Sequence, residues 1–469
     1  MCYDRNSFNL DECVHLQRGE RGPMKRPLAG LLALGMSLAC LSGCMFGSVE
    51  EMYALPKSSQ AYVDLQAKIN AEKGAAEYIA PLSGENRQTI QLVDVDGDGR
   101  QEAVTFFRDA AAEKPLKIVI FRQDDHEDYQ VATRIEGVGS EIESIDYLDL
   151  DDQPGKDLLV SWQASASVHT LVGYALSENQ ALEILRSGYN RYLTADVDED
   201  KREEVILAQT ESGGSSHLRL EYYDGRQGTM ELVNTAALSE GATDISSWTA
   251  GRLEGEAPAL FVTSYLDEDL LVTDVFTADG EGLKSISMDS DARRSESVYR
   301  YSPGVRPGDR NGDGITEVPV GKAVEAYGES TVDQFWWLDW VRYRPNGDSQ
   351  GVMTTYQSTD GSWYLEIPKN WTGQFSMNRQ ENAAEGVRSV TFARGTGSSA
   401  EPFLTIRGLV GGDRAEHARQ AGQFILYADN TTVYTAEFLN SRWDCGLNEQ
   451  ELTQRFHVGN EPWADEAEG

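Results

Sequence analysis

The chain has 469 residues, and its 77 acidic against 41 basic side chains give a formal net charge of −36. This length is sufficient for two or three domains with hydrophobic cores of their own. So large an excess of acids argues against nucleic acid or anionic lipid headgroups as a general partner.

The N-terminal part of the chain has the order of a secretory signal. Residues 1–23 are polar and without pattern, and we interpret them as a wrongly assigned start. A short positive region, Lys25-Arg26, then precedes a mostly apolar run over residues 27–41. This run is shorter than the roughly 20 apolar residues that a membrane-spanning helix needs. We therefore predict a signal peptide over residues 24–43.

The segment that closes this run, Leu41-Ser42-Gly43-Cys44, resembles the lipobox of bacterial lipoproteins. The resemblance implies that the chain is cut before Cys44 and lipidated on Cys44. The mature protein is then expected outside the cytoplasm, anchored to the cell membrane by its lipid. Cys445 would be the only other cysteine left, which is too few for a disulfide framework.

Residues 44–83 are expected to hold the anchor, a tether and one short helix that ends near Glu72. Tyr62, Leu65 and Ile69 recur at helical spacing and predict one packing face.

An acidic loop follows at residues 94–102, Asp-Val-Asp-Gly-Asp-Gly-Arg-Gln-Glu, which we call the first loop. Ca²⁺ prefers six to eight oxygen ligands from carboxylates, carbonyls and water. The glycines at positions four and six permit a tight, partly left-handed turn. The predicted ligands are the side chains at positions one, three, five and nine and the carbonyl at position seven, from Asp94, Asp96, Asp98, Glu102 and Arg100 respectively.

The same frame recurs along the chain. The third loop, residues 196–204, lacks both glycines, and its predicted ligands are Asp196, Asp198, Asp200, Arg202 and Glu204. The fourth loop, residues 309–317, has both glycines, and its predicted ligands are Asp309, Asn311, Asp313, Ile315 and Glu317. The second loop, residues 149–157, is weaker because Gln153 stands at position five, and its predicted ligands are Asp149, Asp151 and Asp157. Residues 251–259 stand at the corresponding point of the repeat but have lost the acids at positions one, three, five and nine.

The frames begin at residues 94, 149, 196, 251 and 309, at steps of 55, 47, 55 and 58 residues. A near-constant step of this size is typical of a repeat architecture, most often of propeller blades.

An EF-hand is the competing interpretation, but it needs a bidentate carboxylate at position twelve and a helix behind it. Position twelve is Thr105, Val160, Leu207 or Val320, and strand-like sequence follows. The loops instead resemble the calcium loops of FG-GAP and VCBS-type repeats, the family seen in integrin α-subunit propellers. The resemblance covers about residues 84–345.

The resemblance and the strand pattern predict a mainly β protein. We expect a β-propeller over residues 84–361 with about five blades, or six or seven if a blade has lost its loop. The aromatic run Gln334–Trp340 would pack between strands, which we favour over a platform for sugar rings. Residues 362–469 are expected to form a small α+β domain, with helices near 413–421 and 448–456.

Motifs of common catalytic sites are absent from the sequence, including His-Glu-x-x-His, Gly-x-Ser-x-Gly and the P-loop. The predicted function is that of a non-catalytic extracytoplasmic lipoprotein, not an enzyme, that contains Ca²⁺ and binds a protein or a glycan at the cell surface. The alternative is a propeller-fold polysaccharide lyase or hydrolase with its site at the central channel.

Overall fold

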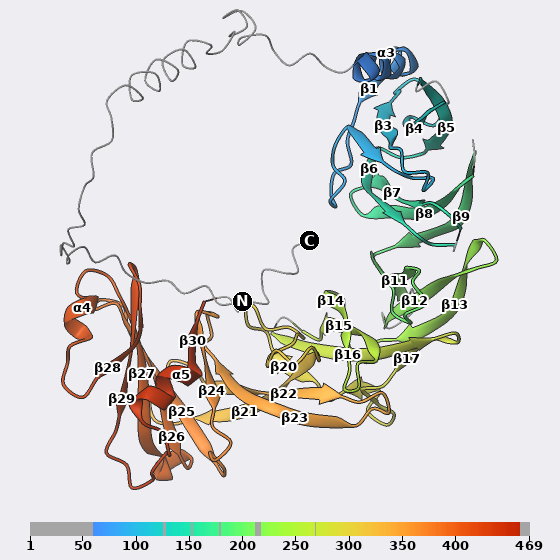
Figure 1. Cartoon of the computed structure of the whole chain (residues 1–469). Coiled ribbons are helices and arrows are strands. Elements are labelled where there is room, and N and C mark those ends of the chain that lie inside the picture. The colour runs from blue at the N-terminus through green and yellow to red at the C-terminus, as the bar shows by residue number, and fades with distance from the viewer. Residues whose placement is uncertain are drawn as a thin grey trace, which may run out of the picture. The chain divides into compact units, whose positions relative to one another are not determined.

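The protein is seen in a computed structural model (Figure 1). The structure describes residues 60–124, 128–151, 153–177, 180–211, 217–267 and 269–459. The predicted signal peptide and Cys44 lie outside these residues. The described part of the chain is mainly β, as predicted, and its residues from Asp64 onward form one compact unit. None of the helices in the described ranges is long and apolar enough to cross a membrane.

Four antiparallel sheets follow one another along the chain, each built largely from consecutive strands (Figure 1). The first sheet contains β1 (Glu77–Tyr78), β2 (Ile90–Val93), β3 (Glu102–Arg108), β4 (Leu116–Gln123) and β5 (Tyr129–Gly137). The second contains β6 (Glu141–Leu148), β7 (Asp157–Ser165), β8 (Val168–Ser177) and β9 (Gln180–Tyr189). The third contains β10 (Arg191–Ala195), β11 (Glu204–Glu211), β12 (His217–Arg226) and β13 (Thr229–Ala237). The fourth contains β14 (Asp244–Arg252), β15 (Pro258–Tyr265), β16 (Leu270–Asp279), β17 (Gly282–Ser285) and β20 (Val298–Arg300).

The strands after the second and third loops are apolar on both faces because sheets pack against both of their sides. In β7, Leu158 and Val160 belong to a hydrophobic cluster shared with the first sheet. Leu159, which points the opposite way, belongs to a cluster shared with the third sheet. In β11, Leu207 packs toward the second sheet and Ile206 toward the fourth. Consecutive sheets are therefore stacked face to face.

Helix α3 (Gln60–Lys73) confirms the helix predicted before the first sheet. Leu65 and Ile69 are buried in a cluster with side chains of β3 and β4. Tyr62 does not share this buried face, since 52% of it is exposed. Of the three residues predicted to form the packing face, Leu65 and Ile69 do so and Tyr62 does not.

The fifth period does not form a separate sheet. Its strands are β21 (Glu317–Ala326), β22 (Gln334–Tyr343) and β23 (Ser349–Gln357). They join a ten-stranded sheet with the order β28-β29-β27-β26-β25-β21-β22-β23-β24-β30. Its other members are β24 (Trp363–Ile367), β25 (Phe375–Asn382), β26 (Val387–Arg394), β27 (Glu401–Val410), β28 (Phe424–Ala428), β29 (Thr432–Phe438) and β30 (Phe456–Val458).

The sheet continues across residue 361, where the sequence predicts a domain boundary. Strands β23 and β24 pair directly on either side of it, and β21 pairs in parallel with β25. One hydrophobic cluster contains Trp337 and Tyr356 from before residue 361 and Trp363 and Phe392 from after it. The predicted α+β part therefore shares its core with the last repeat.

Two helices accompany these strands. Helix α4 (Arg414–His417) is shorter than the predicted helix at residues 413–421. Helix α5 (Glu449–Arg455) begins at Asn448, which forms a capping box with Glu451.

The aromatic run of β22 packs mainly between strands, as we expected. Trp337 and Trp340 are 3% and 1% exposed. Trp337 lies in the core of the ten-stranded sheet, whereas Trp340 and Leu338 pack with Tyr299 on the opposite face. Trp336 is half-buried.

Candidate metal centres

The first three loops occupy the same place in their sheets. Each connects two consecutive antiparallel strands that pair with each other, β2 to β3, β6 to β7 and β10 to β11, so the acidic residues lie at the end of a hairpin. The fourth loop precedes β21, and only an isolated bridge between Gly308 and Glu317 stands where the first strand would be. Strands follow all four loops, which confirms the argument against an EF-hand.

In the first, third and fourth loops, the carboxylate at position one accepts hydrogen bonds from backbone N–H groups of its own loop. In the first loop, Asp94 accepts hydrogen bonds from the N–H groups of Gly97 and Gly99, at 2.8 and 3.0 Å. In the fourth loop, Asp309 accepts bonds from the corresponding N–H groups at positions four and six, both at 2.8 Å. In the third loop, Asp196 accepts one from Lys201 at 3.1 Å. The turn is thus held by its own first acid.

The third loop adopts the same backbone although it has no glycine. Gly97 and Gly99 have φ values of 74° and 85°, in the left-handed region. Glu199 and Lys201 occupy the same two positions in the third loop with φ values of 65° and 77°. A residue with a Cβ is strained there. The third loop therefore takes the same backbone shape without any glycine, so the acids that both loops share determine that shape more strongly than glycine does.

The carboxylate at position nine is buried in every loop. Glu204 and Glu317 are both 0% exposed, Glu102 is 1% exposed and Asp157 is 6% exposed. One oxygen of each accepts a hydrogen bond from the N–H group at position two, at 2.8–2.9 Å. This bond closes the loop across its base.

The second oxygen of two of these carboxylates has no hydrogen-bond donor. Oε1 of Glu204 and Oε1 of Glu317 are buried and unpartnered among the described residues. Burial raises the pKa of Glu204 to about 8 and the pKa of Glu317 to about 7. The pKa of Asp157 is likewise raised by burial, to about 7. A nearby cation would keep such carboxyls ionised and give the unpartnered oxygens a ligand.

Three of the loops gather their acids closely enough to hold a metal ion. Within each group, one carboxylate oxygen from every member lies within 4.8 Å of the others. The groups are Asp94, Asp96 and Glu102; Asp149, Asp151 and Asp157; and Asp196, Asp198, Asp200 and Glu204. The structure thus brings the predicted ligands together in the first, second and third loops.

Some predicted ligands stand apart from these groups. Asp98 is paired with Arg100 at 2.8 Å, and its carboxylate is not part of the first group. In the fourth loop, Asn311 donates a hydrogen bond to Asp313 at 3.0 Å, and Arg342 pairs with the same carboxylate at 3.3 Å. The fourth loop forms no group of three acids.

The residue at position seven was predicted to act through its backbone carbonyl, and its side chain has a role that the prediction missed. In the first and third loops this residue is Arg100 or Arg202, and its guanidinium binds the carboxylate at position five. The hydrogen bond from Arg100 is the largest contribution that lowers the pKa of Asp98. The signal in the sequence is an arginine two residues after an aspartate. In the fourth loop Ile315 stands at this place, and its side chain is buried.

Neighbouring loops also contact one another through their backbones. The N–H group at position eight of the second loop, on Lys156, donates to the carbonyl of Val95 in the first loop at 2.8 Å. The same position of the third loop, Glu203, donates to the carbonyl of Asp149 at 3.0 Å. Residues 251–259 have Pro258 at this position, which has no N–H to donate. The first three loops therefore form a continuous row.

Comparisons with known proteins do not assign the chain to a family. No family model and no curated protein matches it. Among solved structures, it is similar to a subtype N11 neuraminidase-like protein of A/flat-faced bat/Peru/033/2010 (H18N11). The match has 10% sequence identity and a TM-score of 0.20, and it covers 76% of this chain and 89% of that one.

The expectation that the chain is not an enzyme is corrected by this comparison. The matched protein is named after an enzyme, so we no longer hold that expectation. At this identity and TM-score, the match shows neither an enzymatic nor a non-enzymatic nature.

Proposed function

We propose that the chain is an extracytoplasmic bacterial lipoprotein, anchored to the membrane through Cys44, that binds a protein or a glycan at the cell surface. In this proposal its loops are FG-GAP-like calcium sites. The ions hold the hairpins of a propeller of about five blades in shape.

One observation carries the calcium part of the proposal. Glu204 and Glu317 are fully buried at the base of their loops, and each has one oxygen without a hydrogen-bond donor. An ionised carboxylate in such a place is costly unless a cation balances it. In the third loop, one carboxylate oxygen each of Asp196, Asp198 and Asp200 lies within 4.8 Å of one from Glu204, so a balancing cation belongs in that loop.

The chemistry of the ligands favours Ca²⁺ over other metal ions. All the predicted side-chain ligands offer oxygen, and neither imidazole nor thiolate is among them. Soft or borderline metals such as zinc prefer nitrogen and sulfur. Ca²⁺ accepts six to eight oxygens in flexible geometry, which suits loops that differ in position five. Extracellular calcium modules bind with a Kd of about 10⁻⁴–10⁻³ M, and we expect the same range here.

Pairing of the acids at position five with arginine is compatible with this assignment. The ion pair between Asp98 and Arg100 lies at the surface, where solvent screening leaves such a pair with little net stabilisation. Asp98 can therefore exchange its arginine for a cation at little cost.

Calorimetric titration of CaCl₂ into the metal-stripped protein tests the calcium part. We expect uptake at more than one site, with Mg²⁺ binding more weakly because it demands strict octahedral geometry. Absence of uptake at millimolar Ca²⁺ would contradict the proposal. The ligand-binding part is tested separately by capture of partners from intact cells with the tagged, calcium-loaded protein.

A further inference from the structure

A cavity of about 420 Å³ lies in the ten-stranded sheet, away from the acidic loops. One wall is the turn between β23 and β24, and the other is the hairpin between β25 and β26. Its floor comes from β23, β24, β26, β27 and β29. This volume is within the range of about 300–1,000 Å³ that is usual for small-molecule sites.

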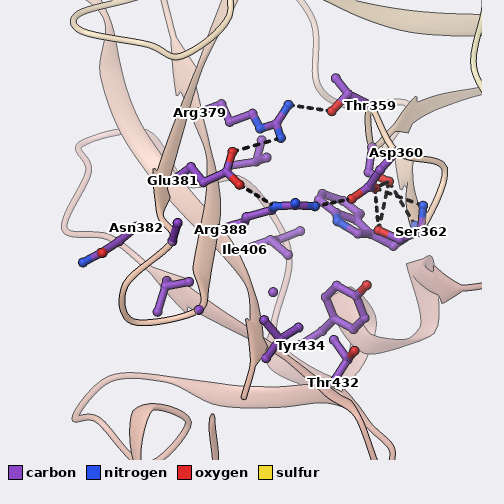
Figure 2. A pocket seen from close by; sticks show the side chains of 18 of the residues that line it. Thr359, Asp360, Ser362, Arg379, Glu381, Asn382, Arg388, Ile406, Thr432 and Tyr434 are labelled. Carbon is purple, nitrogen blue, oxygen red and sulfur yellow. Dashed lines mark hydrogen bonds and ion pairs between the residues drawn. The ribbon is translucent and has the colours of Figure 1, made fainter. Parts of the chain in front are cut away.

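The rim of the cavity carries a network of ion pairs between arginines and acids (Figure 2). Arg388 lies between two acids and donates to Asp360 at 2.7 Å and to Glu381 at 2.9 Å. Arg379 donates to Thr359 at 2.6 Å and pairs with the other oxygen of Glu381 at 3.6 Å. The side chains come from both walls, so these contacts join the turn to the hairpin.

Asp360, the acid at one end of this network, is held ionised. Burial alone would raise the pKa of Asp360, but hydrogen bonds from Ser362 and Ser358, together with the charge of Arg388, bring the pKa below its ordinary value. The two arginines therefore face two carboxylates, and the rim carries no net charge.

A rim with this balance favours a neutral ligand. An anion would have to displace Asp360 or Glu381 from Arg388, and it would also approach a protein with a net charge of −36. A cation would have to displace an arginine. A ligand with several hydroxyl groups can instead accept from the arginines and donate to the carboxylates without breaking a pair.

The floor of the cavity is apolar and partly aromatic. Tyr356, Trp363 and Tyr434 line it together with Val390 and Ile406. Tyr356 and Trp363 pack edge to face, with ring centroids 5.3 Å apart. These five side chains are at most 7% exposed, so they give the cavity a narrow apolar base for the C–H groups of one sugar ring, while the rim suits its hydroxyl groups.

We propose that this cavity binds a neutral saccharide, one or two sugar residues at the end of a glycan chain. The inference rests on the glycan part of the proposed function and gives it a location and a chemical class. It does not depend on the calcium sites.

An array of neutral oligosaccharides, each matched by a form that carries a sialic or uronic acid, tests the inference on the full chain in CaCl₂. We expect binding to neutral members and at least ten-fold weaker binding to their acidic counterparts. Arg388→Gln removes a charged donor and should weaken binding about ten-fold or more. Thr432→Trp, which fills the cavity, should also weaken it.

Arg344→Gln is the matched control, because Arg344 forms a similar half-exposed ion pair with Glu254 elsewhere. Each variant is first checked for an unchanged melting temperature in CaCl₂. Equal binding by wild type, Arg388→Gln and Thr432→Trp would place the glycan site elsewhere and overturn the inference while leaving glycan binding intact. Preference for acidic members, or no binding by the wild type, would also overturn it, and neither result bears on the calcium titration.

Discussion

At the scale of single residues, the acid at position nine has two tasks that its sequence position alone does not reveal. One of its oxygens closes the loop by accepting the N–H at position two. The other faces the loop, and in Glu204 and Glu317 it has no donor. A glutamine at the same place would keep the shape but remove the charge.

The first prediction concerns this charge. Glu204→Gln combined with Glu317→Gln should abolish much of the stabilisation by Ca²⁺, which is about 2.7 kcal/mol per site at a free ligand concentration one hundred times Kd. In EDTA the double variant should be at least as stable as the wild type, because at these two positions it no longer buries a carboxylate that lacks a cation. Urea unfolding in CaCl₂ and in EDTA measures both effects.

Glu231→Gln serves as the control, since Glu231 is exposed on β13. It should leave the response to Ca²⁺ unchanged. A double glutamine variant that gains as much stability from Ca²⁺ as the wild type would count against these two residues as ligands.

The second prediction concerns strain in the third loop. Lys201 has a φ of 77°, and a left-handed conformation costs a residue with a side chain about 1–2 kcal/mol. Lys201→Gly should therefore raise the free energy of unfolding in CaCl₂ by about 0.5–1 kcal/mol, after allowance for the greater freedom of glycine in the unfolded chain. Urea unfolding is again the measurement.

Glu231→Gly, in a strand with ordinary backbone angles, should lower stability by about 0.5–1 kcal/mol and shows that the gain is not a general effect of glycine. If Lys201→Gly is destabilising, the left-handed conformation of this loop is wrong.

At the scale of elements, the sequence was informative wherever a local pattern decides the structure. The acid spacing located the loops, and the apolar runs behind them located the buried strands. The pairing of arginine at position seven with the aspartate at position five lies within one loop and could have been predicted from spacing, whereas the bond from Arg202 to the carbonyl of Gly225 could not. The contacts between loops could not, because they join residues about fifty positions apart.

Long-range pairing also explains the principal difference between expectation and structure. The turn-rich stretch before residue 362 has the composition of a domain boundary, and yet β23 and β24 pair across it. Whether a turn separates two domains or connects two strands of one sheet depends on which strands are near in space. Nothing local to residues 345–361 indicates that Tyr356 shares a core with Trp337 before this stretch and with Trp363 and Phe392 after it.

The third prediction tests the row of loops. A Cβ on Gly155 in the second loop would lie 2.7 Å from the carbonyl oxygen of Val95 in the first loop. A Cβ on Gly99 would meet nothing within 4 Å, although Gly99 also has a positive φ. Gly155→Ala should therefore destabilise the protein by about 2–3 kcal/mol, and Gly99→Ala by about 1 kcal/mol.

Urea unfolding measures the free energy of unfolding that each variant loses. Both variants bear the cost of a positive φ, so the difference between the two losses reports the close approach of the loops. Equal losses would mean that the close approach of the two loops contributes nothing.

At the scale of the whole molecule, the proposal joins a membrane anchor to a row of cation sites and a separate ligand cavity. The net charge of −36 fits such a protein, since acids assembled in loops repel one another until cations bind.

The fourth prediction concerns the anchor. Cells that express the chain should incorporate radioactive palmitate into it, and Cys44→Ala should abolish the label because no other residue has the lipobox context. The variant should also move from the membrane fraction to the soluble fraction. Cys445→Ala is the control and should label as the wild type does. Equal labelling of all three would contradict lipidation at Cys44.

Thermal unfolding of the protein in CaCl₂ and in EDTA measures whether Ca²⁺ stabilises the loops. The account predicts a melting temperature several degrees higher in CaCl₂, since each kcal/mol shifts a domain of 150–250 residues by about 2–4 °C. Combining Asp96→Ala with Asp313→Ala should lower the temperature in CaCl₂ and shrink the difference made by EDTA. Identical melting temperatures of the wild type with and without Ca²⁺ would contradict the account.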